Sequence, residues 1–317
     1  MISASAPGKI VLFGEHAVVY GRPALAVPVT QVQATAIVRP RSGSGILIDA
    51  PGIGLHSELS QLPSDHPLAA AIIKTLPPSF LQNTRKERGE GLTIHIESTI
   101  PVASGLGSGA AVSVAVIRAL SSFNGFPLSD EQVNAIAYEV EKLHHGTPSG
   151  IDNTVVTYAK PVYFVKGKPI ETFRVGAPFT IVIADTGISA PTKESVGDVR
   201  KLWEADKRKW EPVFDEIGAI ADQAREKIVD GKWEDLGPLM DRNHALLQNL
   251  TVSCPELDRL VEAGRHAGAL GAKLSGGGRG GNMMALVQPE QAEKVVLALQ
   301  SAGASCTIMT TIQRSKE

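Results

Sequence analysis

Two carboxylates flank the stretch KLHHGTPSGI, and they have the residue type that phosphoryl transfer requires. Glu141 lies one helical turn after Ala137, at the edge of an apolar stripe, so its side chain can point into a cleft. Asp152 follows Pro and Gly helix breakers, and we expect it on a loop that a helix end and a strand hold rigid. In phosphoryl transfer one carboxylate binds a metal ion and another accepts a hydroxyl proton. The alternative is a solvated glutamate beside an aspartate that caps a turn.

A lysine, a glutamate and a histidine occur together in the N-terminal stretch APGKIVLFGEHAVVYG. Lys9 lies in a strand-like run, and Glu15 and His16 follow a glycine that interrupts this run. On a strand followed by a turn, these three side chains could form the floor of a substrate site. The alternative is that they are ordinary polar residues on the surface.

Two glycine-rich loops are candidates for binding phosphate. The first, GLGSGAA from Gly105 to Ala111, runs into an apolar segment that we expect to be helical. Backbone N–H groups at a helix N-terminus, together with the helix dipole, would hold an anion there, although such a loop can also be a turn without a ligand. The second, SGGGRGGN from Ser275 to Asn282, contains the spacing GxGxxG, but a strand-like segment follows it where a dinucleotide site needs a helix. The Walker A pattern is absent.

These candidate residues lie in a chain that divides into two parts near residue 175. Short β-branched runs bounded by Gly, Pro and Ser predict strands, and apolar positions three and four residues apart predict helices. In the first part we expect strands over 9–21, 23–29, 32–40, 45–50 and 91–98, a polar surface loop over 79–91, helices over 66–76 and 110–122, a helix opened by a capping box at 129–132, and two short strands over 155–167. In the second part we expect strands over 178–188, 271–276, 282–287 and 305–312, and helices over 196–231, 233–250, 255–268 and 289–303.

Composition restricts the class of protein. The 317 residues predict about two domains, and the hydrophobic content of 43% is enough for a sizeable core. A net charge of −2 does not indicate a polyanionic partner, and no basic block interleaved with aromatic residues predicts nucleic-acid binding. No apolar run approaches a membrane span, no secretory signal is recognisable, and two cysteines are too few for a disulfide framework. We therefore expect a cytoplasmic protein without a nucleic-acid or membrane partner.

The sequence resembles the GHMP kinases, a family that includes galactokinase, homoserine kinase, mevalonate kinase and phosphomevalonate kinase, and within it the mevalonate kinases. Three motifs carry the resemblance: PGKIVLFGEHAVVYG, then PVASGLGSGAA, and finally GAKLSGGGRGG near the C-terminus. The stretch HGTPSGIDN is the most particular to the mevalonate kinases, and ADTGISAPTKE and MDRNHALLQNLTVSCPELDRL also look like that branch. The motifs occur in the family's order and cover nearly the whole chain.

The resemblance implies an α+β fold of two lobes. A ribosomal protein S5-like N-terminal lobe over residues 1–175 would carry the ATP phosphate loop and the catalytic residues, and a ferredoxin-like C-terminal lobe over residues 176–317 would carry the third motif. The implied activity is transfer of the γ-phosphate of ATP to the 5-hydroxyl of mevalonate, which gives 5-phosphomevalonate for isoprenoid biosynthesis. ATP and Mg²⁺ would be the cofactors and mevalonate the substrate, and a homodimer would fit a family whose members are often dimers.

The resemblance also implies roles for single residues. Asp152 would be the base that accepts the hydroxyl proton, and Lys9 would favour the ionised Asp152 and stabilise the attacking oxygen. Glu141, together with Ser108, would hold Mg²⁺. The residues implied to bind the ATP phosphates are Pro101, Gly105, Leu106, Gly107, Ser108, Gly109 and Ala110. Those implied to contact or enclose the acceptor substrate are Glu15, His16, Thr186, Gly187, Gly276 and Gly277.

Two positions depart from the family pattern. The chain has Gly109 where a second serine usually follows Ser108, and Arg279 where a glycine is usual. An added cation near a phosphate loop would suit a substrate that carries its own phosphate, so a kinase of 5-phosphomevalonate or of another small hydroxy acid is the alternative. Arg279 could equally point to solvent. A non-catalytic ligand sensor on the same fold is a third hypothesis, disfavoured because Lys9, Glu141 and Asp152 are all present.

Overall fold

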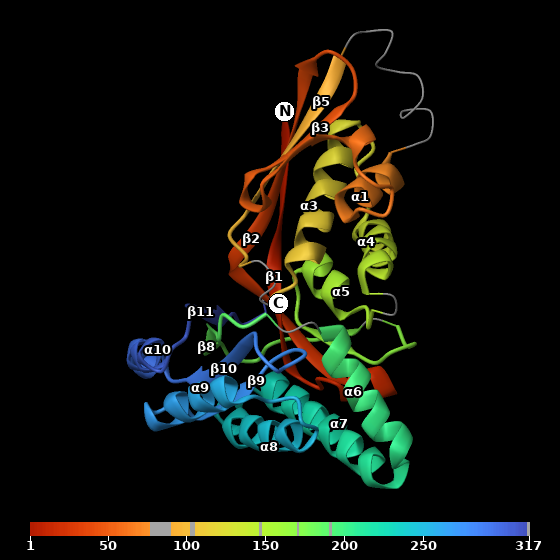
Figure 1. The fold of residues 1–317 in the computed structure, drawn as a ribbon. Coiled ribbons are helices and arrows are strands. Elements are labelled where there is room, and N and C mark those ends of the chain that lie inside the picture. The colour runs from red at the N-terminus through yellow and green to blue at the C-terminus, as the bar shows by residue number, and fades with distance from the viewer. Residues whose placement is uncertain (77–89, 102–104, 146–147, 170, 190–191, 316–317) are drawn as a thin grey trace. The chain divides into compact units, whose positions relative to one another are not determined.

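The computed structural model describes residues 1–76, 90–101, 105–145, 148–169, 171–189 and 192–315 (Figure 1). Most of the surface loop predicted over 79–91 therefore lies outside the described residues. The chain forms two compact units that interleave along the sequence. The first unit comprises Met1–Gly8, Val32–Val102 and Gly107–Ala159, and the second comprises Lys9–Gln31, Ala103–Leu106 and Lys160–Glu317. The lobe boundary predicted between residues 175 and 176 stays a prediction.

A twisted sheet forms one layer of the first unit. Strand β2 (Ala24–Ser42) pairs antiparallel through its residues 34–42 with β5 (Glu90–Ser98), which pairs in parallel with β3 (Ile46–Ala50). Strand β4 (Leu55–Glu58) continues the sheet from β3, and β1 (Ile2–Phe13) pairs with β2. On β5, Leu92, Ile94 and Ile96 are buried in the core.

Helices cover one side of this sheet (Figure 1): α1 (Pro67–Thr75), α3 (Ser108–Phe123), α4 (Asp130–His145) and α5 (Ile151–Tyr158). Helix α3 is buried along most of its length, as its apolar sequence predicted. The capping box of α4 is confirmed, because the Ser129 N–H donates to Gln132 Oε1 at 2.9 Å and the Gln132 N–H donates to Ser129 Oγ at 3.4 Å.

Several predicted strands differ from the structure. The strand predicted over 9–21 ends at Phe13 and is followed by the 3-10 helix η1 (Ala17–Tyr20), and the strands predicted over 23–29 and 32–40 form the single strand β2.

Residues 155–158, expected as a strand, belong to helix α5, and Asp152 consequently lies in a helical first turn and not on a loop. Gly150 precedes this helix with a φ of 91°, a left-handed conformation from which a helix can start sharply. The β-branched Val155 and Val156 are fully buried, so tertiary packing against α3 and α4 overrides their strand propensity.

A four-stranded antiparallel sheet lies at the centre of the second unit. Its strands are β8 (Phe179–Asp185), β9 (Gly271–Leu274), β10 (Asn282–Val287) and β11 (Cys306–Ile312), in the spatial order β11-β8-β10-β9. Helices connect β8 to β9 and β10 to β11, while β9 and β10 are joined by the glycine loop. This succession of strand, helix, two strands, helix and strand is ferredoxin-like, as expected.

The helices of the second unit are α6 (Thr192–Ala205), α7 (Lys207–Asp230), α8 (Leu236–Asn249), α9 (Pro255–His266) and α10 (Ala292–Ser301). The single helix predicted over 196–231 is two helices, α6 and α7, because the helix is interrupted at Asp206, whose carboxylate accepts the Lys209 N–H and caps α7. The other three helices follow the predicted ranges closely. Helices α8 and α9 pack against β9, and α10 packs against β8 and β11 (Figure 1). The remaining elements are strands β6 (Val162–Phe164) and β7 (Glu171–Thr172) and the 3-10 helices η1 (Ala17–Tyr20), η2 (Pro51–Ile53), η3 (Leu59–Gln61), η4 (Trp233–Asp235) and η5 (Pro289–Gln291).

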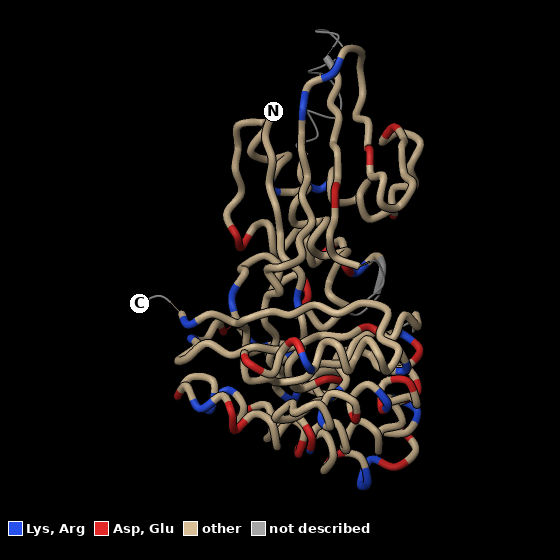
Figure 2. Tube along the Cα trace, turned by 90° about the vertical axis from the view of Figure 1, so that its left-hand side faces the viewer, with Lys and Arg blue, Asp and Glu red and all other residues tan. Residues whose placement is uncertain are grey.

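The surface of the helical part of the second unit is mixed in charge. Lysine and arginine alternate there with aspartate and glutamate (Figure 2). Several of them form surface ion pairs, such as Lys227 with Asp235 at 2.7 Å and Arg242 with Glu216 at 2.6 Å. None of the helices in the described ranges combines the length and the apolar character that crossing a bilayer requires.

Candidate active site

The N-terminus of α3 has a backbone geometry that suits an anion. Gly105 and Gly107 have φ values of 77° and 74°, which residues with a Cβ rarely adopt, and Gly107 caps the helix. The Ala111 N–H closes the first turn on Gly107 O at 2.9 Å. The N–H groups of residues 108–110 therefore have no acceptor within the helix and point out of its positive end. Pro101, the other residue predicted to bind phosphate, precedes residues outside the described part of the chain.

The Glu141 carboxylate lies beside this helix terminus. Its residue is 6% exposed, and a Cβ added to Gly109 would stand 3.8 Å from Glu141 Oε1. The spacing from Ala137 thus placed Glu141 correctly on the buried edge of α4. A buried carboxylate near backbone N–H groups suits a divalent cation that is shared with phosphate oxygens.

A magnesium ion fits this donor set. Among the described residues, no group of three or more His, Cys, Asp and Glu side chains could hold a metal ion by itself. Mg²⁺ does not require such a group, because it commonly binds through one or two carboxylates, substrate phosphates and water. Glu141 and Ser108, at the first position of α3, are the residues that would hold it.

Asp152 belongs to the same part of the first unit. It is the second residue of α5, half-buried, and α5 packs against both α3 and α4. Asn153 fixes α5 to α4, because its Nδ2 donates to Asn134 Oδ1 at 2.6 Å. The first turn of a helix is a position where a negative charge is stabilised. The first unit therefore places Ser108, Glu141 and Asp152 on three helices that contact one another.

In the second unit, the predicted Lys9 and the second motif are joined through the backbone. Lys9 is buried on β1, and its N–H donates to Leu106 O at 2.9 Å. Gly14 ends this strand with a φ of 94°, and a Cβ there would stand 2.4 Å from Ala24 Cα, so the turn requires glycine. Glu15 and His16 follow in the turn, and both are buried.

Glu15 is held from two sides. Its Oε1 forms an ion pair with Lys273 Nζ on β9, and its Oε2 accepts a hydrogen bond from Asn243 Nδ2 on α8 at 3.3 Å. Lys273 Nζ also donates to the Leu274 carbonyl oxygen at 2.6 Å. The side chains of Lys273 and Glu15 are 0% and 1% exposed. Sequence reasoning missed Lys273 and Asn243, because nothing local links them to Glu15.

His16 contacts the third motif. Its Nε2 donates to Gly277 O at 3.1 Å, and burial lowers its pKa to about 4, so the imidazole is neutral near pH 7. With the proton on Nε2, Nδ1 is a hydrogen-bond acceptor, and within the described residues this buried atom has no partner. His16 also has a φ of 61°, which is uncommon for a residue other than glycine.

The glycine loop of the third motif packs against the start of α6. Gly276 has a φ of 87°, and a Cβ added to Gly277 would stand 3.0 Å from Thr192 Oγ1 and 3.1 Å from Ser195 Oγ. These two hydroxyls were missed by sequence reasoning. The signal was present in the stretch APTKE, where a proline precedes a threonine at the start of a helix.

Thr186 and Gly187 lie where β8 ends. The Thr186 hydroxyl donates to Gly281 O at 3.0 Å and accepts the Ile188 N–H at 3.2 Å. Gly187 has a φ of 73°, and a Cβ there would approach Ser305 Cβ to 3.0 Å. Thr186 therefore binds the end of the third-motif loop, and its predicted place in the substrate wall stays a prediction.

The comparisons with known proteins agree along the whole chain. The model of the GHMP kinases N-terminal domain matches residues 71–160, and that of the GHMP kinases C-terminal domain matches residues 224–305. Mevalonate kinase of Thermococcus sibiricus is 40% identical over 99% of this chain and 96% of its own length, and that of Pyrococcus furiosus is 37% identical over 99% and 96%. This chain belongs to the mevalonate kinases of the GHMP kinase family.

Solved structures of the family have the same fold. L. major mevalonate kinase in complex with R-mevalonate is similar with a TM-score of 0.84 and 32% identity, over 99% of this chain and 97% of that chain. Methanococcus jannaschii mevalonate kinase is similar with a TM-score of 0.83 and 27% identity, over 99% and 98%. Streptococcus pneumoniae phosphomevalonate kinase, at 17% identity and a TM-score of 0.79 over 98% and 100%, shows only that the fold is shared.

Arg279, one of the two departures from the GHMP kinase pattern, is engaged within the second unit. Its Nη1 forms an ion pair with Asp198 Oδ2 on α6 at 2.5 Å, and its Nε donates to Thr251 O at 3.3 Å. The hydrogen bonds from Arg279 and Lys201 lower the pKa of the Asp198 carboxyl to about 2. Arg279 thus joins the third-motif loop to α6, and its predicted contact with a phosphate stays a prediction.

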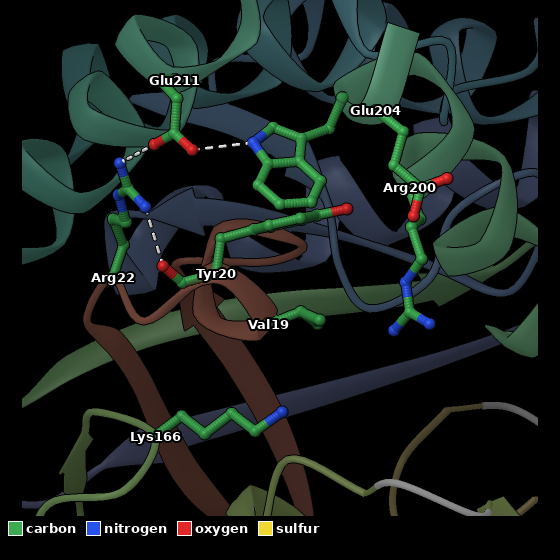
Figure 3. A pocket seen from close by; sticks show the side chains of 8 residues that line it. Val19, Tyr20, Arg22, Lys166, Arg200, Glu204 and Glu211 are labelled. Atoms are coloured by element: carbon green, nitrogen blue, oxygen red, sulfur yellow. Dashed lines mark hydrogen bonds and ion pairs between the residues drawn. The ribbon is translucent and has the colours of Figure 1, made fainter. Parts of the chain in front are cut away.

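A pocket of about 460 Å³ in the second unit contains none of the predicted GHMP kinase site residues (Figure 3). Arg22 spans its wall, donating to the Tyr20 carbonyl oxygen at 2.7 Å and forming an ion pair with Glu211, which also accepts the Trp203 indole N–H at 2.7 Å. These contacts attach the end of η1 to α6 and α7, so this wall of the pocket supports the segment that follows His16. The lining residues are Val19, Tyr20, Arg22, Lys166, Arg200, Trp203, Glu204 and Glu211.

Proposed function

We propose that this chain transfers the γ-phosphate of ATP to the 5-hydroxyl of mevalonate and releases 5-phosphomevalonate and ADP. The observation that carries the proposal is the buried Glu141 carboxylate beside the glycine-capped N-terminus of α3. This is an arrangement for a phosphate chain and its cation, and it occurs in a chain that belongs to the mevalonate kinases.

The phosphate-donor side of the reaction uses α3. The N–H groups of residues 108–110 would bind the phosphates of ATP, the donor that GHMP kinases use, and Glu141 and Ser108 would hold Mg²⁺. Bound Mg²⁺ would neutralise charge on the transferring phosphoryl group. Gly109 leaves room beside the Glu141 carboxylate, so the Ser108 hydroxyl or a water molecule would take the place of the family's second serine.

The acceptor side of the reaction needs a base and a stabiliser of the attacking oxygen. Asp152 would take the proton of the 5-hydroxyl while that oxygen attacks the γ-phosphorus and the bond from this phosphorus to the β-γ bridging oxygen breaks. The Lys9 ammonium would stabilise negative charge on the attacking oxygen. His16 would accept a hydrogen bond from the substrate through its unprotonated Nδ1, and Thr186, Gly187, Gly276 and Gly277 would enclose the substrate.

A coupled assay of ADP release with ATP and Mg²⁺ tests the proposal across mevalonate, 5-phosphomevalonate, homoserine, galactose and no acceptor. We expect turnover with mevalonate alone, and 5-phosphomevalonate as the product. Preference for 5-phosphomevalonate would instead indicate that the chain is a kinase of 5-phosphomevalonate. Because Arg279 is paired with Asp198, no observation favours that second activity. The absence of turnover with every acceptor would contradict the proposal.

A further inference from the structure

We infer that Glu15, Lys273 and Asn243 form a positioning cluster that fixes His16 for binding the acceptor substrate. Glu15 then acts through the turn that carries His16 and does not touch the substrate itself. The inference rests on the proposed function for the identity of the substrate, and it adds two residues that neither the sequence motifs nor the similarity had assigned to the site.

The first argument is that each carboxylate oxygen of Glu15 is bound by another element of this unit. Oε1 is bound to Lys273 Nζ and Oε2 to Asn243 Nδ2, and the side chain is 1% exposed. The carboxylate thus connects the first-motif turn to β9 and to α8.

The second argument is that three alternate residues of one segment, β9 and the loop after it, bind the first motif. Positions 273, 275 and 277, each two residues apart on β9 and the loop after it, all bind the first motif. Lys273 binds Glu15, Ser275 Oγ donates to Val11 O at 2.8 Å, and Gly277 O accepts the His16 Nε2 hydrogen at 3.1 Å. The central and last of these contacts are neutral hydrogen bonds, and the first is a buried ion pair.

The third argument concerns the conformation that these contacts impose. His16 has a φ of 61°, and such a residue keeps this conformation only when its surroundings fix it. Glu15 immediately precedes it, and the Ala17 N–H bonds to Glu15 O at 2.6 Å. Clamping the Glu15 side chain therefore restricts the backbone of His16 and the direction of its imidazole.

A buried ion pair at this point is not explained by stability alone. Replacing a buried pair with uncharged residues of similar volume is often neutral or stabilising, whereas removal of one partner leaves an unpaired buried charge. Replacing both partners with uncharged residues therefore separates a role in stability from a role in positioning His16. It removes the ion pair without leaving an unpaired buried charge.

The experiment compares the wild type with Lys273→Met, Asn243→Ala and the double variant Glu15→Gln/Lys273→Met. For the double variant we expect a Tm close to that of the wild type, a KM for mevalonate raised at least tenfold, and a KM for ATP within twofold. Asn243→Ala keeps the ion pair and should raise the mevalonate KM by a smaller factor. A double variant with wild-type Tm and wild-type KM for mevalonate overturns the inference.

The matched control is Arg242→Met/Glu216→Gln. It removes an ion pair that Arg242 of α8, the neighbour of Asn243, forms with Glu216, and these two side chains are 57% and 36% exposed. We expect both KM values to stay within twofold of the wild type. An equal rise of the mevalonate KM in this control would show a general effect of disturbing α8 and would overturn the inference.

A second readout does not depend on turnover. In ¹⁵N-histidine-labelled protein, with His16→Asn to assign the signal, we expect wild-type His16 to carry its proton on Nε2 and the double variant to show a mixed tautomer and a raised titration midpoint. Besides burial, the cation that lowers the pKa of His16 is Arg279, and it is unchanged in every variant. An unchanged His16 signal in the double variant overturns the cluster, whereas failure of mevalonate turnover in the wild type overturns only the proposed function.

Discussion

At the scale of single residues, Asp152 has the most specific proposed role, that of the base. It occupies the first turn of α5, while Asn153 ties the helix to α4. Asn153, the next residue, thus attaches the first turn of α5, which carries the proposed base, to α4. Replacement of this carboxylate by an amide of the same shape tests its role with little effect on packing.

We predict that Asp152→Asn lowers kcat for mevalonate by roughly 10²- to 10⁴-fold, the usual contribution of a general base. The Tm should change by only a few degrees, because the side chain is half-buried. Steady-state kinetics and thermal unfolding of the same preparation check both statements. Full activity in this variant would exclude Asp152 as the base.

The two buried histidines of the second unit predict a loss of stability in acid. Burial lowers the pKa of His16 and of His244 to about 4, well below 6.5. The unfolded chain therefore binds protons between pH 6.5 and 4 that the folded chain does not, and the free energy of unfolding falls as the pH decreases through this window. At pH 5 each histidine should lower the free energy of unfolding by about 2 kcal/mol relative to pH 7.5.

Urea unfolding at pH 7.5 and pH 5 measures this loss. His244 is the better test, because its Nδ1 accepts the Leu274 N–H and its Nε2 lies 3.2 Å from Asp258. In His244→Gln the difference in unfolding free energy between the two pH values should be smaller by the contribution of one histidine, about 2 kcal/mol. A pH dependence identical to that of the wild type would show that His244 titrates normally.

At the scale of elements, the N-terminus of α3 shows how one substitution relative to the family changes a site. Gly109 occupies a helical position, where glycine is less favourable than serine by roughly 0.5 kcal/mol. A serine hydroxyl there would lie close to the Glu141 carboxylate. The helix terminus therefore gives up some local stability and leaves open space beside the acidic residue.

We predict that Gly109→Ser and Gly109→Ala both raise the Tm slightly, while only the serine variant lowers the Mg²⁺ concentration needed for half-maximal activity. The added hydroxyl supplies an oxygen near Glu141, and the added methyl group does not. Magnesium titrations of the three proteins at saturating ATP check this. Equal Mg²⁺ requirements in the serine and alanine variants would contradict it.

Elements with a strong local pattern could be predicted from the sequence, and contacts between distant segments could not. The apolar run of α3, the capping box at Ser129 and the ferredoxin-like succession of strands all have local signals. Helix α5 was missed because Val155 and Val156 favour strands locally and become helical through packing. Lys273 and Glu15 are 258 residues apart, and no pattern within one segment connects them.

At the scale of the whole molecule, the chain passes repeatedly from one unit to the other. Strands β1 and β2 both continue across the division, and residues 9–31 belong to the second unit although the rest of it begins only after residue 102. The units are therefore not two successive pieces of sequence. Each unit is made of several sequence segments, and segments of the other unit lie between them in the sequence.

We predict that a fragment of residues 176–317 does not fold alone. It contains Lys273, fully buried in the complete chain, but lacks Glu15, and an unpaired buried ammonium is strongly unfavourable. Circular dichroism and a urea titration of the fragment check this, with the full chain as the control. A cooperative unfolding transition in the fragment would contradict the prediction, and recovery on mixing with residues 1–175 would support it.

The separation of Glu15 and Lys273 in the sequence also determines how long Glu15 exists before its partner is synthesised. A ribosome that adds roughly 5 to 20 residues per second needs roughly 13 to 50 s to make the 258 residues that separate the two partners. Throughout that time the first motif has left the ribosome without the strand that fixes its turn. The earliest part of the chain to be made is thus among the last to reach its final conformation, and the nascent N-terminus is the part that a chaperone would have to protect the longest.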